Sequence, residues 1–117
     1  MTQLKNLVIE ALEDLKAKEM IVLDIAALTT VADVMIICSG TSNRHVKSIA
    51  QAVIEKAKTA GMEVLGVEGE KQGEWVLVDL GDIVVNVMLP KTREFYALER
   101  LWDIYPLPLK MRTCAAV

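Results

Sequence analysis

The sequence is poor in the residues that build metal centres and disulfide-stabilised folds. It contains two cysteines and one histidine, His45. Cys38 lies in an apolar run and Cys114 lies near the end of the chain, so we expect no disulfide between them. One histidine without clustered cysteines does not supply the ligands of a zinc site. We therefore expect no metal, no cofactor and a reducing, cytoplasmic environment.

Long hydrophobic runs are also absent, although 53% of the residues are hydrophobic. Every apolar run ends well before the roughly 20 residues that a membrane-spanning helix needs. The first helical stretch carries Lys5, Glu10, Glu13 and Asp14, which does not fit a signal peptide. A chain of 117 residues can bury a core without staples. The sequence thus predicts one domain that does not enter a membrane.

Aromatic residues are scarce and lie only beyond residue 74. They are Trp75, Phe95, Tyr96, Trp102 and Tyr105. The first seventy residues must therefore build their core from aliphatic side chains. We expect the aromatic end of the chain to serve recognition or to anchor a helix.

Basic residues are nearly missing from residues 63–82. This stretch has a net charge of −5, whereas the whole chain carries −3. Its acidic residues are Glu63, Glu68, Glu70, Glu74, Asp79 and Asp82. Negative charge opposes binding to a phosphate backbone and favours a basic partner protein. A solvated, glutamate-rich loop is the alternative interpretation.

The apolar periodicity predicts three helices, over residues 2–15, 42–61 and 92–105. The expected N-caps are Thr2, Thr41 or Ser42, and Thr92. Gly61 is placed to end the second helix, and Pro106 to end the third. Phe95, Leu98, Trp102 and Tyr105 would share one face of the third helix.

Runs rich in β-branched residues predict strands over 20–25, 33–38 and 63–67, followed by a hairpin over 74–90. The strand 33–38 has no polar alternation after Asp33, so we expect it to be central. With the second helix and the strand 63–67 it predicts a right-handed crossover. The expected fold is a single α/β domain over residues 1–105, a mixed five-stranded sheet packed with three helices. Its topology is nucleotidyltransferase-like without the catalytic motif, and a flexible tail is expected over 106–117.

The hairpin is the most informative part of the chain. If Leu80 and Gly81 form the turn between Asp79 and Asp82, Trp75 pairs with Asn86. One face is then aliphatic, and the other carries Trp75, Leu77, Asp79, Asp82, Val84, Asn86 and Met88. A face that mixes a tryptophan with carboxylates and an amide is typical of a docking surface. The alternative is that Trp75 packs under the last helix.

No convincing catalytic motif accompanies this surface. Residues 39–42, Ser-Gly-Thr-Ser, precede a helix and could hold an anion, but they lack the spacing of a P-loop or dinucleotide site. Asp79 and Asp82 are three residues apart, which does not suit a pair of metal-binding carboxylates on one strand. We interpret residues 39–42 as a loop and helix cap, His45 as structural and Cys38 as a buried apolar residue.

Three runs of the sequence carry a family resemblance. They are S-G-T-S-N-R-H-V-K-S-I-A (39–50), E-G-E-K-Q-G-E-W-V-L-V-D-L-G-D (68–82) and T-R-E-F-Y-A-L-E-R-L-W (92–102). Over residues 4–103 the chain resembles the ribosomal silencing factor family, also called iojap-like. The resemblance implies a small α/β domain, often dimeric when free, with no known catalytic residues. It also implies binding to large-subunit ribosomal protein fourteen, which sterically blocks the small subunit and lowers translation when nutrients are short.

The resemblance places the partner surface on the hairpin, where Trp75 and Leu80 match the family's docking positions. The full set of expected partner-binding residues is Trp75, Leu80, Met88, Leu89, Asp79, Asp82, Glu68 and Glu70. Asn86 stands where the family usually has histidine, and Lys91 stands where an acidic residue is common. The segment 107–117 lies outside the resemblance. Two rival functions are a nucleotide-binding or nucleotidyl-transferring enzyme and an adaptor in large-subunit assembly.

Overall fold

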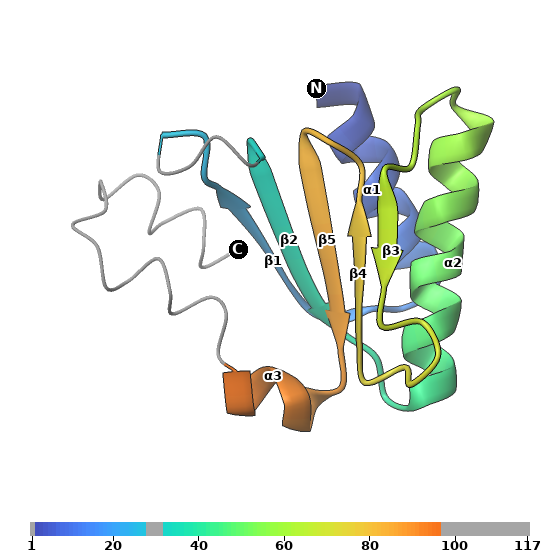
Figure 1. The fold of residues 1–117 in the computed structure, drawn as a ribbon, viewed down its shortest axis with the longest axis vertical. Coiled ribbons are helices and arrows are strands. Elements are labelled where there is room, and N and C mark those ends of the chain that lie inside the picture. The colour runs from blue at the N-terminus through green and yellow to red at the C-terminus, as the bar shows by residue number, and fades with distance from the viewer. Residues whose placement is uncertain (1, 28–31, 97–117) are drawn as a thin grey trace.

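Five strands form one mixed sheet in the order β1-β2-β5-β4-β3 (Figure 1). The computed structural model describes residues 2–27 and 32–96. The strands are β1 (Lys18–Asp24), β2 (Val34–Ser39), β3 (Gly66–Glu68), β4 (Trp75–Asp79) and β5 (Ile83–Met88), and the helices are α1 (Thr2–Asp14), α2 (Asn43–Thr59) and α3 (Pro90–Tyr96). Strands β2 and β5 are parallel and the other neighbours are antiparallel. The predicted α/β class, with five strands and three helices, is confirmed.

Helices α1 and α2 pack together over one face of the sheet (Figure 1). The α2 stripe predicted from periodicity is buried in full: Val46, Ile49, Ala50, Val53, Ile54 and Ala57. It meets the β-branched side chains of β4 and β5 that point the same way, including Val76, Val78 and Val85. Burial of these aliphatic side chains is the main force that holds the helices on the sheet. The core therefore lies between the helices and the sheet.

Both ends of α2 follow from single residues. The Ser42 hydroxyl caps the helix by accepting the His45 backbone N–H at 3.1 Å, as predicted. After the C-terminal residue Thr59 and the C-cap Ala60, Gly61 has a φ of 79°, which glycine adopts without steric cost. The helix therefore stops where the sequence predicted.

The predicted crossover spans most of the sheet. Strand β3 is antiparallel to β4, which is antiparallel to β5, so β3 runs parallel to β2 with two strands between them. The strand begins at Gly66 rather than Glu63. The reason lies in its partner: the Leu65 N–H bonds to the carbonyl of Asp79, the last residue of β4, at 2.8 Å. Residues 63 and 64 extend past the end of β4 and find no strand to pair with.

Helix α3 begins two residues before the predicted cap Thr92. The Arg93 N–H donates to the Leu89 carbonyl at 2.9 Å, so Leu89 holds the N-cap position and Pro90 is the first helical residue. Proline suits this position because its missing N–H would have no helical partner. Phe95, predicted to share one face of this helix with Leu98, Trp102 and Tyr105, is 81% exposed. The remainder of the predicted helix and the predicted tail lie outside the described residues.

Candidate functional site

The β4–β5 hairpin has a register two residues away from the predicted one. Trp75 is opposite Met88, and Asn86 is opposite Leu77. The Leu80 N–H donates to the Ile83 carbonyl at 2.9 Å, so the connection between the strands is Gly81-Asp82 rather than Leu80-Gly81. A turn displaced by one residue moves the register by two, and a shift of two keeps every side chain on its predicted face.

The turn is fixed by glycine and by a side chain. Gly81 has a φ of 89°, a conformation that favours glycine, and its N–H donates to the Asp79 carboxylate at 2.9 Å. Gly81 is the first residue of the observed two-residue connection, whereas the predicted Leu80-Gly81 turn placed it second. The two carboxylates differ in role: Asp79 is partly buried and holds the turn, whereas Asp82 is exposed in it.

The face of the sheet that points away from α1 and α2 is called here the far face. It has its own apolar cluster: Leu23, Ile25, Ala32, Ile37, Val84 and Met88, with Ile21, Met35, Trp75 and Leu77 packed against it. Trp75 and Leu77 of β4 are only partly buried, while Met88 is fully buried. The far face is therefore partly open at Trp75 and Leu77 on β4, and also at Ile21 and Met35 on β1 and β2.

Leu80 is not on this face. It is 7% exposed and belongs to the core under α1 and α2, so this expected docking residue is buried in the free protein. Side chains alternate along a strand, which places Leu80 with Val76 and Val78, on the side opposite Trp75. Trp75 begins β4 and Leu80 follows its last residue, so the two lie roughly 17 Å apart at 3.3 Å per residue. They do not form one contiguous contact.

The remaining predicted residues are divided between surface and interior. Glu68, Glu70 and Asp82 are exposed. Met88 is fully buried in the far-face cluster, and Leu89 is partly buried against the helix-side core. Leu89 also lines a hollow of about 280 Å³ with Glu74, Lys91, Thr92 and Phe95.

Trp75 is held by a hydrogen bond to the middle of the sheet. Its indole N–H donates to the Asn86 amide oxygen at 2.9 Å. The two residues are diagonal neighbours across the β4–β5 pair, a separation that a large aromatic side chain can reach. Asn86 is 1% exposed, and within the described residues its amide nitrogen has no hydrogen-bond partner.

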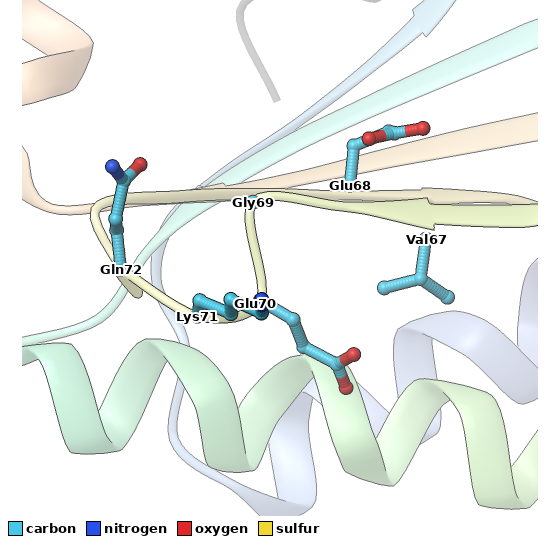
Figure 2. Close-up of a pocket in the computed structure, with 6 residues that line it drawn as sticks. All are labelled: Val67, Glu68, Gly69, Glu70, Lys71 and Gln72. Atoms are coloured by element: carbon cyan, nitrogen blue, oxygen red, sulfur yellow. The ribbon is translucent and has the colours of Figure 1, made fainter.

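The acidic loop between β3 and β4 has a defined shape. Gly69 has a φ of 83°, and a Cβ there would lie 1.9 Å from the Trp75 carbonyl oxygen. The Asn43 side chain at the start of α2 donates to the Gln72 carbonyl at 2.8 Å. The loop surrounds a hollow of about 420 Å³ lined by residues 67–72. Figure 2 shows that Glu68 points away from α2, whereas Glu70 points towards it.

The Ser-Gly-Thr-Ser loop is occupied by its own hydrogen bonds. The His45 Nδ1 accepts the Thr41 N–H at 2.8 Å, and Nε2 meets the Leu15 carbonyl at 2.7 Å. A nitrogen facing a carbonyl must carry the proton, so Nε2 is the donor and Nδ1 the acceptor. His45 thereby joins the end of α1 to the start of α2, which confirms its structural interpretation. Within residues 2–27 and 32–96, no cluster of acidic, histidine or cysteine side chains suits a metal ion.

Two side chains next to this loop, Cys38 and Arg93, are buried. Burial raises the pKa of the Cys38 thiol to about 12, although Arg93 opposes this shift, so the group stays protonated at neutral pH. This confirms Cys38 as a buried apolar residue.

Sequence reasoning missed Arg93, which is 5% exposed and donates to the Glu19 carbonyl at 2.6 Å and the Ser39 hydroxyl at 3.2 Å. No local pattern marks Arg93, because its partners lie 74 and 54 residues away along the chain. In the part of the chain that the structure describes, no helix combines the length and apolarity needed to cross a bilayer.

Comparison with known proteins agrees with this architecture. A crystal structure of a protein from Chromobacterium violaceum superimposes with a TM-score of 0.86 at 50% identity, covering 88% of this chain and 86% of that one. A curated ribosomal silencing factor, RsfS, from the same species is 51% identical over 100 residues, 86% of this chain and 82% of the relative. The mouse protein named mitochondrial assembly of ribosomal large subunit protein 1 is 29% identical over 102 residues, 85% of this chain and 45% of the relative.

The family model described as "Ribosomal silencing factor during starvation" matches residues 1–114. This match runs further towards the C-terminus than the resemblance seen over residues 4–103. It covers nearly the whole chain, and the fold and relatives point the same way. The chain therefore belongs to the ribosomal silencing factor family.

Proposed function

We propose that this protein binds the large ribosomal subunit and blocks its joining with the small subunit, which lowers translation when nutrients are limiting. The family's name supports silencing during starvation, and the resemblance supports large-subunit ribosomal protein fourteen as the direct partner. The same resemblance supports a homodimer in the free protein. The observation that carries the proposal is the partly buried Trp75, which is tied to the sheet by its hydrogen bond to Asn86.

The docking surface comprises Trp75, Leu77, Glu68 and Asp79 on the far face near the β3 edge. Glu68 is paired with Leu77 across β3 and β4, and Asp79 ends the same strand. An apolar pair beside carboxylates combines a contact that excludes water with charges that select a basic partner. Tryptophan is also among the residue types that most often dominate binding energy at interfaces.

The other predicted residues support this surface in different ways. Leu80 and Met88 are buried, so they shape the hairpin from within. Leu89 borders the hollow beside exposed Phe95 at the start of α3. Glu70 and Asp82 are exposed and add to the negative potential that attracts a basic partner.

Steric occlusion needs no catalytic group. The protein measures 36 × 32 × 21 Å along its principal axes. A stable interface of ordinary size covers about 800 Å² on each partner, which a domain of this size can supply from one face. The shortest of these axes is 21 Å. A bound protein of that thickness would keep the small subunit from reaching the surface that it covers.

A second candidate function is an adaptor role in large-subunit assembly. The observation in its favour is the mouse relative, whose name states that role. It would use the same docking surface on an immature subunit. The two candidates differ in whether the bound large subunit is mature.

Replacing Trp75 with alanine tests the docking surface directly. We expect affinity for purified large subunits to fall by about 2 kcal/mol or more, roughly thirtyfold, because the central apolar contact is lost. The matched control is Ile83→Ala, which removes a core side chain of the neighbouring strand β5 on the helix side of the sheet and costs about 2–5 kcal/mol of stability. The control should bind like the parent at temperatures where it is folded. Normal binding by Trp75→Ala, or lost binding that merely follows unfolding, contradicts the proposed surface.

A further inference from the structure

Asn86 is a polar residue in an otherwise apolar part of the far face. Its cross-strand neighbours are Ile37 of β2 and Leu77 of β4. On its own strand, the residues two positions away are Val84 and Met88, both buried in the same cluster. With 1% of its surface exposed, the Asn86 amide is almost fully removed from solvent.

The hydrogen bond from Trp75 determines how this amide is oriented. An indole N–H can only donate, so the amide oxygen must face Trp75 and the amide nitrogen must point elsewhere. Within the described residues, that nitrogen finds no acceptor. The orientation therefore satisfies the indole and leaves a buried donor unsatisfied.

The magnitudes argue against a purely structural role. The typical cost of an unsatisfied buried donor exceeds the typical net gain from one hydrogen bond. On these central values the two effects together do not stabilise the fold. An aliphatic residue, which suits a strand, would avoid the buried donor. The amide at this position therefore calls for an explanation other than stability.

We propose that Asn86 is a positioning residue that holds the Trp75 indole in its binding orientation. This inference rests on the proposed function, in which Trp75 is the central docking residue. Trp75 is the first residue of β4 and only partly buried, so packing covers only part of its ring. The bond to Asn86 anchors the ring's polar edge to the centre of the sheet. A ring already fixed in the free protein loses less conformational freedom when the partner binds.

The test is a double-mutant cycle between the two residues. Asn86→Val removes the acceptor, and Trp75→Phe removes the donor while keeping an aromatic ring. In the parent background, Asn86→Val should weaken binding to purified large subunits about tenfold, the upper range for one hydrogen bond. In the Trp75→Phe background, it should change affinity little. Asn86→His should retain most of the affinity, because a neutral imidazole also offers one acceptor nitrogen.

The melting temperature of Asn86→Val distinguishes a role in positioning Trp75 from a role in folding. Asn86→Val should melt no lower than the parent, because it also removes the unsatisfied donor. An equal loss of affinity in both backgrounds, no loss in either, or a loss that follows a lower melting temperature overturns the inference.

Hydrogen exchange of the Trp75 indole N–H tests the same bond without ribosomes. Its ¹⁵N resonance is assigned by its absence from the Trp75→Phe spectrum. Exchange should be slow in the parent and Asn86→His proteins and faster in Asn86→Val. If the parent fails to bind large subunits, the proposed function fails, and this exchange measurement then decides whether Asn86 fixes the ring. Equal exchange in the parent and Asn86→Val overturns the positioning role.

Discussion

Replacing Gly69 with alanine perturbs the loop that leads into Trp75 without touching any docking side chain. Gly69 has a φ of 83°, and an added Cβ would lie 1.9 Å from the Trp75 carbonyl oxygen. No real Cβ tolerates that distance, and the atom in the way is backbone rather than a flexible side chain. The loop or the start of β4 must therefore move.

The expected loss of stability has two parts. A left-handed conformation costs a residue with a Cβ about 1–2 kcal/mol. Relieving the overlap with the Trp75 carbonyl adds to this, so we expect a total above about 2 kcal/mol, a large share of the roughly 5–15 kcal/mol of a typical domain. Gly66→Ala is the matched control in the adjoining strand. Gly66 has an ordinary φ and no atom within 4 Å of the new Cβ, so this change should alter stability by less than about 1 kcal/mol.

Urea unfolding followed by far-ultraviolet circular dichroism measures both variants. The Gly69→Ala midpoint should fall clearly below the parent, and the Gly66→Ala midpoint should lie close to it. Affinity for large subunits should fall with Gly69→Ala even where the protein is folded, because the backbone of Trp75 has moved. If the two glycine variants unfold at the same urea concentration, the loop does not have the described shape.

Two further predictions concern charge and protonation. Replacing Glu68, Glu70 and Glu74 with glutamine should slow association with the basic partner and flatten the salt dependence of that association rate, with little change in the dissociation rate. The control Glu55→Gln on α2 should change neither the association rate nor its salt dependence. An effect on the dissociation rate alone would rule out electrostatic steering. Because burial raises the pKa of the Cys38 thiol from 9.0 to about 12, the folded protein keeps a proton that the unfolded chain loses, so stability should fall as the pH rises through that interval. Urea unfolding between pH 8 and about 11 should show a smaller fall for Cys38→Ala, and equal slopes would contradict the buried thiol.

The fold was largely predictable because it depends on periodic patterns. The α2 stripe, the interior strand β2 and the two faces of the hairpin follow from apolar spacings that only one type of local structure satisfies. Strand β3 was mispredicted because its length depends on where β4 ends, which is a property of the partner strand.

The hairpin shows how a small local error can leave the larger result intact. The sequence does not say whether Leu80 or Asp82 accompanies Gly81 in the turn, because both choices leave a two-residue connection. The choice decides whether Leu80 continues the β4 alternation into the core, as it does. The burial of Leu80 therefore could not be predicted, although the faces of the two strands were predicted correctly.

Other contacts could not be predicted because they join distant segments. The Arg93 side chain reaches Glu19, and the His45 ring reaches Leu15, and neither pair has a sequence pattern. The bond between Trp75 and Asn86 depends on the true register, in which the two are diagonal rather than opposite. Such contacts follow from tertiary packing rather than from local propensity.

Sedimentation of the protein with ribosomal particles tests the central claim most directly. Extracts from nutrient-limited cells would be separated on a sucrose gradient and the protein detected in each fraction. The account predicts that it travels with mature large subunits and is missing from joined ribosomes. Presence only on immature large subunits would favour the assembly role. Presence on joined ribosomes, or absence from large subunits altogether, would contradict silencing by steric occlusion.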